Sequence, residues 1–162
     1  MSDSMIKKCL FPAAGYGTRF LPTTKSMPKE MMPIVNKPLI QYGVEEAMAA
    51  GMDNMAIITG RGKRALADHF DINYELEHQI AGTDKEGLLE QIRYVIENCT
   101  FSYTRQIEMK GLGHAILTDA LLTQAIHGNG VLGYKFKGRR FDCGSVPGFM
   151  EASQYYFENN LY

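Results

Sequence analysis

The hydrophobic and polar positions of the chain alternate between short apolar runs and longer segments with helical spacing. Four short runs predict strands, at residues 8–13, 55–59, 101–106 and 131–136. The segments between and after them predict helices, which we expect at residues 40–50, 63–70, 74–80, 85–97, 114–126 and 146–159. Strands that alternate with helices of this length predict βαβ units and a parallel sheet. The predicted fold class is therefore α/β.

One segment interrupts this alternation. Five of the six prolines lie between Pro12 and Pro38, and each proline ring fixes φ and removes an amide donor, so we expect neither a regular helix nor a central strand there. The segment still carries apolar side chains that can pack, such as Phe20 and Ile34. Long ordered loops are often functional. This one begins at the carboxyl end of the first strand, where parallel sheets bind their ligands, and we expect the chemistry of the chain here.

Length and composition narrow the class of protein. The chain has 162 residues, of which 45% are hydrophobic and 22% charged, which predicts one globular domain over residues 5–162 behind a short leader at residues 1–4. The net charge of -1 argues against a chain-wide interaction with nucleic acid or membrane surfaces. Three widely spaced cysteines, Cys9, Cys99 and Cys143, favour reduced thiols and a cytoplasmic location.

The Pro-rich segment has a charge balance different from that of the whole chain. Four basic residues lie between Pro12 and Pro38 against one acidic residue, Glu30, which gives a local charge of +3. Gly15 and Gly17 directly follow the first strand, and such a turn can bring backbone amides close to phosphate oxygens. The pattern indicates a phosphate site, although a strand-ending turn with a solvated basic face fits the same residues.

Two common phosphate motifs are excluded by the residues present. No segment matches the G-x-x-x-x-G-K-[ST] pattern of P-loop proteins. The dinucleotide fingerprint needs a third glycine three positions after Gly17, and Phe20 stands there. If the turn binds phosphate, it belongs to another class of nucleotide site.

Three separated segments carry a resemblance to a known family. Residues 13–42, AAGYGTRFLPTTKSMPKEMMPIVNKPLIQY, resemble the signature of the sugar-nucleotide pyrophosphorylases. Arg105-Gln106 with residues 110–115, and residues 136–145, resemble two further segments of that family in the same order. The chain is most similar to bacterial members that use UTP and glucose 1-phosphate. The resemblance implies a Rossmann-like nucleotidyltransferase fold with a mainly parallel sheet flanked by helices.

The resemblance also implies roles for residues of the first segment. Ala13, Ala14 and Gly15 match the backbone cradle for the nucleotide. Arg19 matches the arginine that binds the triphosphate, and Lys29 matches the lysine that neutralises charge around the α-phosphate. Arg19 and Lys29 are therefore the expected catalytic residues.

Further roles follow from the same resemblance. Glu30 matches a position that helps to hold the nucleotide. Gln106 and Gly111 match the positions that contact the uracil edge, and Asp142 matches an aspartate that helps to hold Mg²⁺. The family's tendency to form homodimers or homotetramers is also implied for this chain.

The reaction implied by the resemblance suits these residue types. An oxygen of glucose 1-phosphate attacks the α-phosphorus of UTP, and pyrophosphate leaves. The attacking phosphate is already anionic, so catalysis needs alignment and charge neutralisation rather than a general base or a covalent nucleophile.

The chain departs from the family in its middle. The family's proteins are nearly twice as long, and the residues up to 117 match their first half, whereas residues 118–162 match their C-terminal end. The family's central Ala-Asp-Asp strand end and its Glu-Lys element for the sugar phosphate have no counterpart. Either an internal deletion has removed these parts, or the sequence leaves out a middle segment that the protein has. A deletion would leave unpaired sheet edges and uncovered apolar faces, which favours the second explanation.

Three functions remain open at this point. The first is uridylyl transfer from UTP to glucose 1-phosphate. The second is a shortened chain that binds a uridine nucleotide without transferring it. The third is a related nucleotidyltransferase with another base or sugar.

Overall fold

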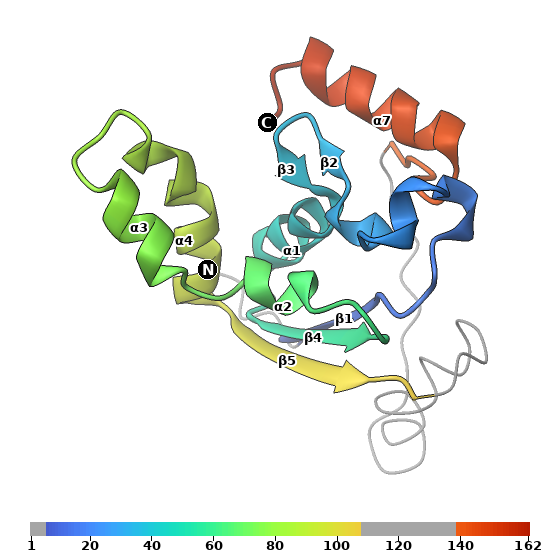
Figure 1. Cartoon of the computed structure of the whole chain (residues 1–162), viewed down its shortest axis with the longest axis horizontal. Helices are drawn as coiled ribbons and strands as arrows, with labels where there is room; N and C mark the ends of the chain where they lie inside the picture. The colour runs from blue at the N-terminus through green and yellow to red at the C-terminus, as the bar shows by residue number, and fades with distance from the viewer. Residues whose placement is uncertain (1–5, 108–138) are drawn as a thin grey trace.

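A three-stranded parallel sheet forms one side of the structure, which the computed structural model describes for residues 6–107 and 139–162 (Figure 1). The strands are β1 (Lys8–Pro12), β4 (Asn54–Thr59) and β5 (Thr100–Arg105), and β4 lies between the other two. All three run parallel, so the expected parallel sheet is confirmed. The strand expected at 131–136, the helix expected at 114–126 and the junction expected at Leu117–Thr118 lie outside the described residues.

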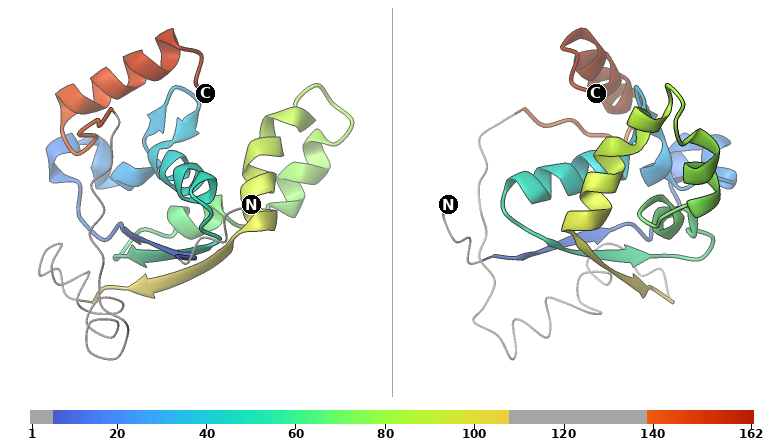
Figure 2. Two further views of the ribbon diagram at one scale, coloured as in Figure 1. Left: turned by 180° about the vertical axis from the view of Figure 1, so that it is seen from behind. Right: turned by 90° about the vertical axis from the view of Figure 1, so that its left-hand side faces the viewer.

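Helices connect these strands across one face of the sheet. The helix α1 (Leu39–Ala49) lies between β1 and β4 in the chain, and the connection from β4 to β5 contains α2 (Ala65–His69), α3 (Tyr74–Ile80), the 3₁₀ turn η4 (Glu86–Leu89) and α4 (Glu90–Asn98). Among the described residues, the helices lie on the same side of the sheet (Figure 2). The single helix expected at 85–97 is therefore divided, and Gly87 accounts for its weak first turn because glycine disfavours the α-helix.

The main core fills the space between this sheet face and α1, α2 and α4. Val44, Ile57 and Leu66 are completely buried there. They come from α1, β4 and α2, so the core fixes the two loops that leave the carboxyl ends of β1 and β4.

The Pro-rich segment is an ordered loop without a long regular element. It contains three 3₁₀ turns, η1 (Thr18–Phe20), η2 (Thr23–Lys25) and η3 (Lys29–Met31), followed by the antiparallel two-residue strands β2 (Pro33–Ile34) and β3 (Lys37–Pro38). The expectation that this segment is neither a regular helix nor a central strand is confirmed.

The last helix, α7 (Val146–Glu158), packs against this loop rather than against the sheet (Figure 1). A second apolar cluster joins Phe20 and Ile34 of the loop to Phe149 of α7, and the rings of Phe20 and Phe149 meet edge to face at 5.7 Å. Ser145 caps the helix by accepting a hydrogen bond from the Gly148 amide. The end of the chain is thereby held beside the loop that follows β1.

No helix within residues 6–107 and 139–162 has both the length and the apolar character to cross a bilayer.

Candidate functional site

The turn after β1 presents open backbone at the carboxyl edge of the sheet. The Ala13 amide donates to the Ile58 carbonyl at 2.8 Å, which extends the pairing with β4 by one residue. Within the described part of the chain, the amides of Ala14, Gly15 and Tyr16 donate no hydrogen bond. A Cβ atom placed on Gly15 would meet nothing within 4 Å. Unpaired amides beside open space suit an anion, so Ala13 serves to position the two amides that follow.

Gly17 is required by its conformation and by its neighbours. Its φ of +66° lies in the left-handed region, and an added Cβ atom would lie 3.1 Å from Thr24 Cγ2 and 3.2 Å from Lys29 Cβ. The Thr24 hydroxyl donates to the Gly17 carbonyl at 2.8 Å. The turn and the start of η3 are thus in close contact, which holds Lys29 beside the open amides.

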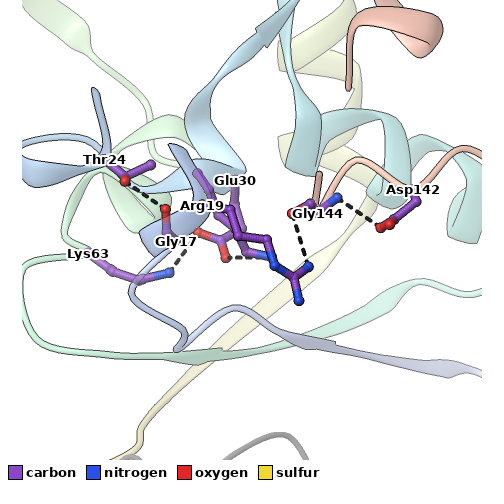
Figure 3. Close-up of polar contacts among 8 residues, drawn as sticks. Gly17, Arg19, Thr24, Glu30, Lys63, Asp142 and Gly144 are labelled. Atoms are coloured by element: carbon purple, nitrogen blue, oxygen red, sulfur yellow. Dashed lines mark hydrogen bonds and ion pairs between the residues drawn. The ribbon is translucent and has the colours of Figure 1, made fainter. Parts of the chain in front are cut away.

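Arg19 and Asp142 meet through Gly144, although 125 residues separate Arg19 from Gly144 (Figure 3). The Arg19 guanidinium donates to the Gly144 carbonyl at 3.2 Å, and the Gly144 amide donates to Asp142 Oδ1 at 3.2 Å. The arginine and the aspartate are both exposed. The packing of α7 on the loop therefore places a cation and a carboxylate at the same opening.

Glu30, which follows Lys29 directly in η3, lies between two lysines. Lys63 Nζ donates to Glu30 Oε2 at 2.7 Å, and Lys29 Nζ lies 3.9 Å from Glu30 Oε1. Glu30 is only 7% exposed and Lys63 only 8%. Burial lowers the pKa of Lys63, while its hydrogen bond and charge interaction with Glu30 act in the opposite direction. Any effect of Glu30 on a nucleotide has to pass through the residues it touches.

Lys63 was not among the site residues predicted from the sequence. A signal was present, because Gly60-Arg61-Gly62-Lys63 repeats after β4 the Gly-x-Gly pattern found after β1. Lys37 was counted toward the local positive charge of the Pro-rich segment. In the structure Lys37 instead donates to Glu45 at 2.9 Å, so its charge is neutralised away from the turn.

Gln106 occupies the same edge of the sheet, two strands from Gly15. It follows β5 directly and is buried, and its backbone amide donates to the Thr59 carbonyl at 2.8 Å. Since β4 lies between β1 and β5, the Gly15 turn and Gln106 lie on either side of the carboxyl end of β4. Gly111 lies outside the described residues.

Asp142 is the residue that fits a divalent cation. It offers exposed carboxylate oxygens, which are hard ligands, and only Oδ1 takes part in a hydrogen bond within the described residues. Residues 6–107 and 139–162 contain no cluster of three or more candidate metal ligands. One carboxylate that works together with substrate phosphates is the usual arrangement for Mg²⁺, so Asp142 fits that ion.

Comparison with known proteins identifies the family of the chain. Residues 10–134 match the model of the family described as nucleotidyl transferase. The chain belongs to the nucleotidyl transferase family. The α/β fold with a parallel sheet predicted from the sequence is thereby confirmed.

Relatives of the chain include proteins named as uridylyltransferases. The chain is 75% identical over 114 residues to a UTP–glucose-1-phosphate uridylyltransferase of Pseudomonas aeruginosa, a match that covers 70% of this chain and 41% of that protein. The chain thus spans about two-fifths of the length of this curated relative.

Solved structures extend the likeness to nearly the whole chain. A crystal structure of apo UDP-glucose pyrophosphorylase aligns with a TM-score of 0.83 and 37% identity, covering 96% of this chain and all of that one. A structure of UDP-glucose pyrophosphorylase complexed with UDP-glucose aligns with a TM-score of 0.76 and 34% identity, with the same coverage. The recognised family and the observed fold therefore agree.

Proposed function

We propose that this chain carries the nucleotide site of a UTP–glucose-1-phosphate uridylyltransferase, which makes UDP-glucose and pyrophosphate from UTP and glucose 1-phosphate. The convergence of the open amides at Gly15 with Arg19, Lys29 and Asp142 carries the proposal. The names of the relatives described above support the choice of UTP and glucose 1-phosphate.

The proposed roles follow from charge and position. The amides of Ala14 and Gly15, together with the Arg19 guanidinium, would bind the triphosphate. Lys29, whose side chain is one-third exposed, would neutralise charge around the α-phosphate. An anionic oxygen of glucose 1-phosphate forms the new bond to the α-phosphorus. The bond from that phosphorus to the bridging oxygen breaks, and pyrophosphate leaves with the electron pair, so the protein aligns and neutralises polyanions without accepting a proton.

Base recognition and metal binding complete the proposal. Gln106 and Gly111 would contact the uracil edge, and the place of Gln106 at the end of β5 supports this role. Asp142 would hold Mg²⁺, which when bound neutralises phosphate charge and helps to orient the phosphates.

A second function, nucleotide binding without transfer, would use the same open amides and cations but needs no site for the sugar phosphate. Calorimetric titration with UTP and an assay of pyrophosphate exchange into UTP, both in Mg²⁺ buffer, separate the two. Binding together with exchange supports the transferase, whereas binding without exchange supports the binding module. Tighter binding of CTP or dTTP than of UTP would contradict a uridine site, and failure of every nucleotide to bind would contradict both functions.

We also propose a cytoplasmic location and a homodimer or homotetramer. Cys9, Cys99 and Cys143 are all free thiols, which supports a reducing compartment. Light scattering on the purified chain tests the assembly, and a monomer mass at micromolar concentration would contradict it.

A further inference from the structure

Two lysines share one buried carboxylate at the base of the proposed nucleotide site. Lys63 Nζ forms a charge-assisted hydrogen bond with Glu30 Oε2 at 2.7 Å, while Lys29 Nζ is 3.9 Å from Oε1 and too distant for a hydrogen bond. Glu30 Oε1 is buried and accepts no hydrogen bond within the described residues. The two lysines are therefore bound to Glu30 very unequally.

The contact between Lys63 and Glu30 joins two loops that are distant in the chain. Glu30 and Lys29 lie in η3 of the Pro-rich loop, and Lys63 lies between β4 and α2, 33 residues after Glu30. In Figure 3 Lys63 approaches Glu30 from one side, and Arg19 extends toward Gly144 on the other. Lys63 therefore reaches Glu30 from the side opposite the contact of Arg19 with Gly144, and it is buried from solvent.

The charges of Glu30, Lys29 and Lys63 are only partly balanced by one another. Lys63 neutralises Glu30, so the positive charge that remains belongs to Lys29. The Lys29 ammonium donates no hydrogen bond within the described residues, and its side chain is 33% exposed, against 7% for that of Lys63. Without Lys63, Lys29 would be the sole cation beside a buried carboxylate, and a buried carboxylate strongly favours a counterion. Lys29 would then be drawn toward Glu30.

We propose that Lys63 is a positioning residue of the nucleotide site: it occupies the Glu30 carboxylate and so keeps the Lys29 ammonium available for a nucleoside triphosphate. This inference rests on the proposed function, since it assigns a partner to Lys29. It differs from a purely structural role, in which Lys63 would stabilise the fold without affecting Lys29.

The experiment titrates the wild type and a set of variants of the full chain calorimetrically with UTP in Mg²⁺ buffer. We expect Lys63→Met to raise the Kd about tenfold, the scale of one weakened charge contact. Combining Lys63→Met with Glu30→Gln should recover most of this loss, because no carboxylate then remains to attract Lys29. In a Lys29→Ala background, Lys63→Met should change the Kd less than about twofold, because contacts that act through one group are not additive. Arg64→Gln, which removes a neighbouring exposed cation, is the matched control and should bind as the wild type does.

Thermal unfolding of each variant separates folding from positioning. If Lys63→Met alone does not fold, the double variant with Glu30→Gln is compared with the single variant Glu30→Gln instead, and the two should bind UTP equally. A folded Lys63→Met variant that binds UTP as the wild type does would overturn the inference. A tenfold loss in Lys63→Met that persists in the double variant, or that persists in the Lys29→Ala background, would overturn it too.

A second measurement keeps the inference testable if the wild type binds no UTP. Chains labelled with ¹³C-lysine give a Cε–Hε signal for Lys29, which is assigned by its loss in Lys29→Arg. We expect Lys63→Met to move this signal and Arg64→Gln to leave it in place. An unmoved signal in the folded Lys63→Met variant would overturn the positioning role. If Lys63→Met does not fold, the double variant with Glu30→Gln should give the same Lys29 signal as Glu30→Gln alone, and a difference between these two would overturn the role. The absence of UTP binding by itself would contradict only the proposed function.

Discussion

The chain has two Gly-x-Gly turns at the same edge of its sheet, and the first basic residue after each turn lies in an opposite environment. Gly15–Gly17 follows β1, and Arg19 is exposed beyond it. Gly60–Gly62 follows β4, and Lys63 is buried directly after it. Both second glycines have a positive φ, +66° at Gly17 and +77° at Gly62. Two turns with similar backbone thus present one cation to solvent and withdraw the other.

The difference comes from the segment that each turn leads into. After Gly17 the chain enters the long Pro-rich loop, which has space to leave Arg19 at the surface. After Gly62 the chain begins α2 within three residues, and Lys63 is buried against the Glu30 carboxylate, 2.7 Å from Oε2. A buried apolar residue follows closely in both cases, Phe20 after Gly17 and Leu66 after Gly62, so it is the buried carboxylate that distinguishes the two cations.

The largest expected effect distinguishes Arg19, which is exposed after the first turn, from Arg64, which is exposed after the second turn. We expect Arg19→Ala to lower UTP affinity or exchange rate at least about 100-fold, the cost of losing one preorganised charge-stabilising group, and Lys29→Ala to act similarly. Arg64→Ala should change either quantity less than about twofold, because the Arg64 side chain is exposed and pairs with an exposed Asp68. Calorimetry and pyrophosphate exchange measure both. Near-normal function of Arg19→Ala would remove the functional distinction between the turns.

The second prediction concerns the C-terminal support that only the first turn has. A Cβ atom at Gly148 would clash with the Asp142 carbonyl oxygen, so Gly148→Ala must shift the backbone that holds Asp142 and Gly144. We expect a loss of about 2 to 3 kcal/mol in unfolding free energy, the scale of an overpacked site, and weaker UTP binding. Urea denaturation measures the first quantity.

Gly87→Ala is the control for Gly148→Ala, because a Cβ atom there meets only the flexible end of Glu90, at 3.8 Å. Its unfolding free energy should be unchanged or higher by up to about 1 kcal/mol. Equal effects of the two substitutions would show that the contact between α7 and Asp142 is not tight.

The third prediction compares the second glycine of each turn. Alanine at Gly62 has to adopt a positive φ but meets no atom within 4 Å, so we expect a loss of about 1 kcal/mol. Alanine at Gly17 has the same backbone strain and also crowds Thr24 and Lys29, so the loss should be about 2 kcal/mol, with weaker UTP binding. Urea denaturation and UTP titration of both variants test this. A larger loss at Gly62 would reverse the assignment of the crowded turn.

Local structure was largely predictable from the sequence, because it depends on neighbouring residues. Residues 74–80 were expected to be helical, and α3 spans Tyr74–Ile80. The first strand was expected at 8–13 and spans Lys8–Pro12. Apolar spacing and the turn residues agree at these positions, so both boundaries lie within one residue of the prediction.

Contacts between distant segments could not be derived from the residues alone. The hydrogen bond of Glu30 with Lys63, and not with the adjacent Lys29, depends on the placement of β4 beside β1. Lys37 forms its ion pair with Glu45 because α1 follows β3 closely. The proximity of Arg19 to Asp142 was implied only by family resemblance, since it depends on the packing of Phe149 against Phe20. The number of charged residues in the Pro-rich segment was read correctly from the sequence. Where these charges lie in space, and which of them are neutralised by ion pairs, could be known only from the fold.

The smallest expected effect concerns the helix that comes after the second turn. His69 lies in α2 with Nε2 2.9 Å from Gln41 Oε1, and burial lowers its pKa below the ordinary 6.5. As the pH falls through 6.5, the unfolded chain therefore binds a proton that the folded chain excludes until a lower pH. Stability is fully present above about pH 6.5 and declines below it, by less than about 1 kcal/mol down to pH 5.5. Urea denaturation at pH 7.5, 6.5 and 5.5 measures this decline.

His69→Gln should reduce that slope, because a glutamine side chain does not titrate, while UTP binding at pH 7.5 should stay unchanged. This outcome would place the titrating buried group beside the second turn and leave nucleotide binding with the first. An identical slope in His69→Gln would assign the decline to other groups. A large loss of UTP affinity in this variant would show that the core beneath α2 is coupled to the first turn, and the two turns would then have to be treated as one site.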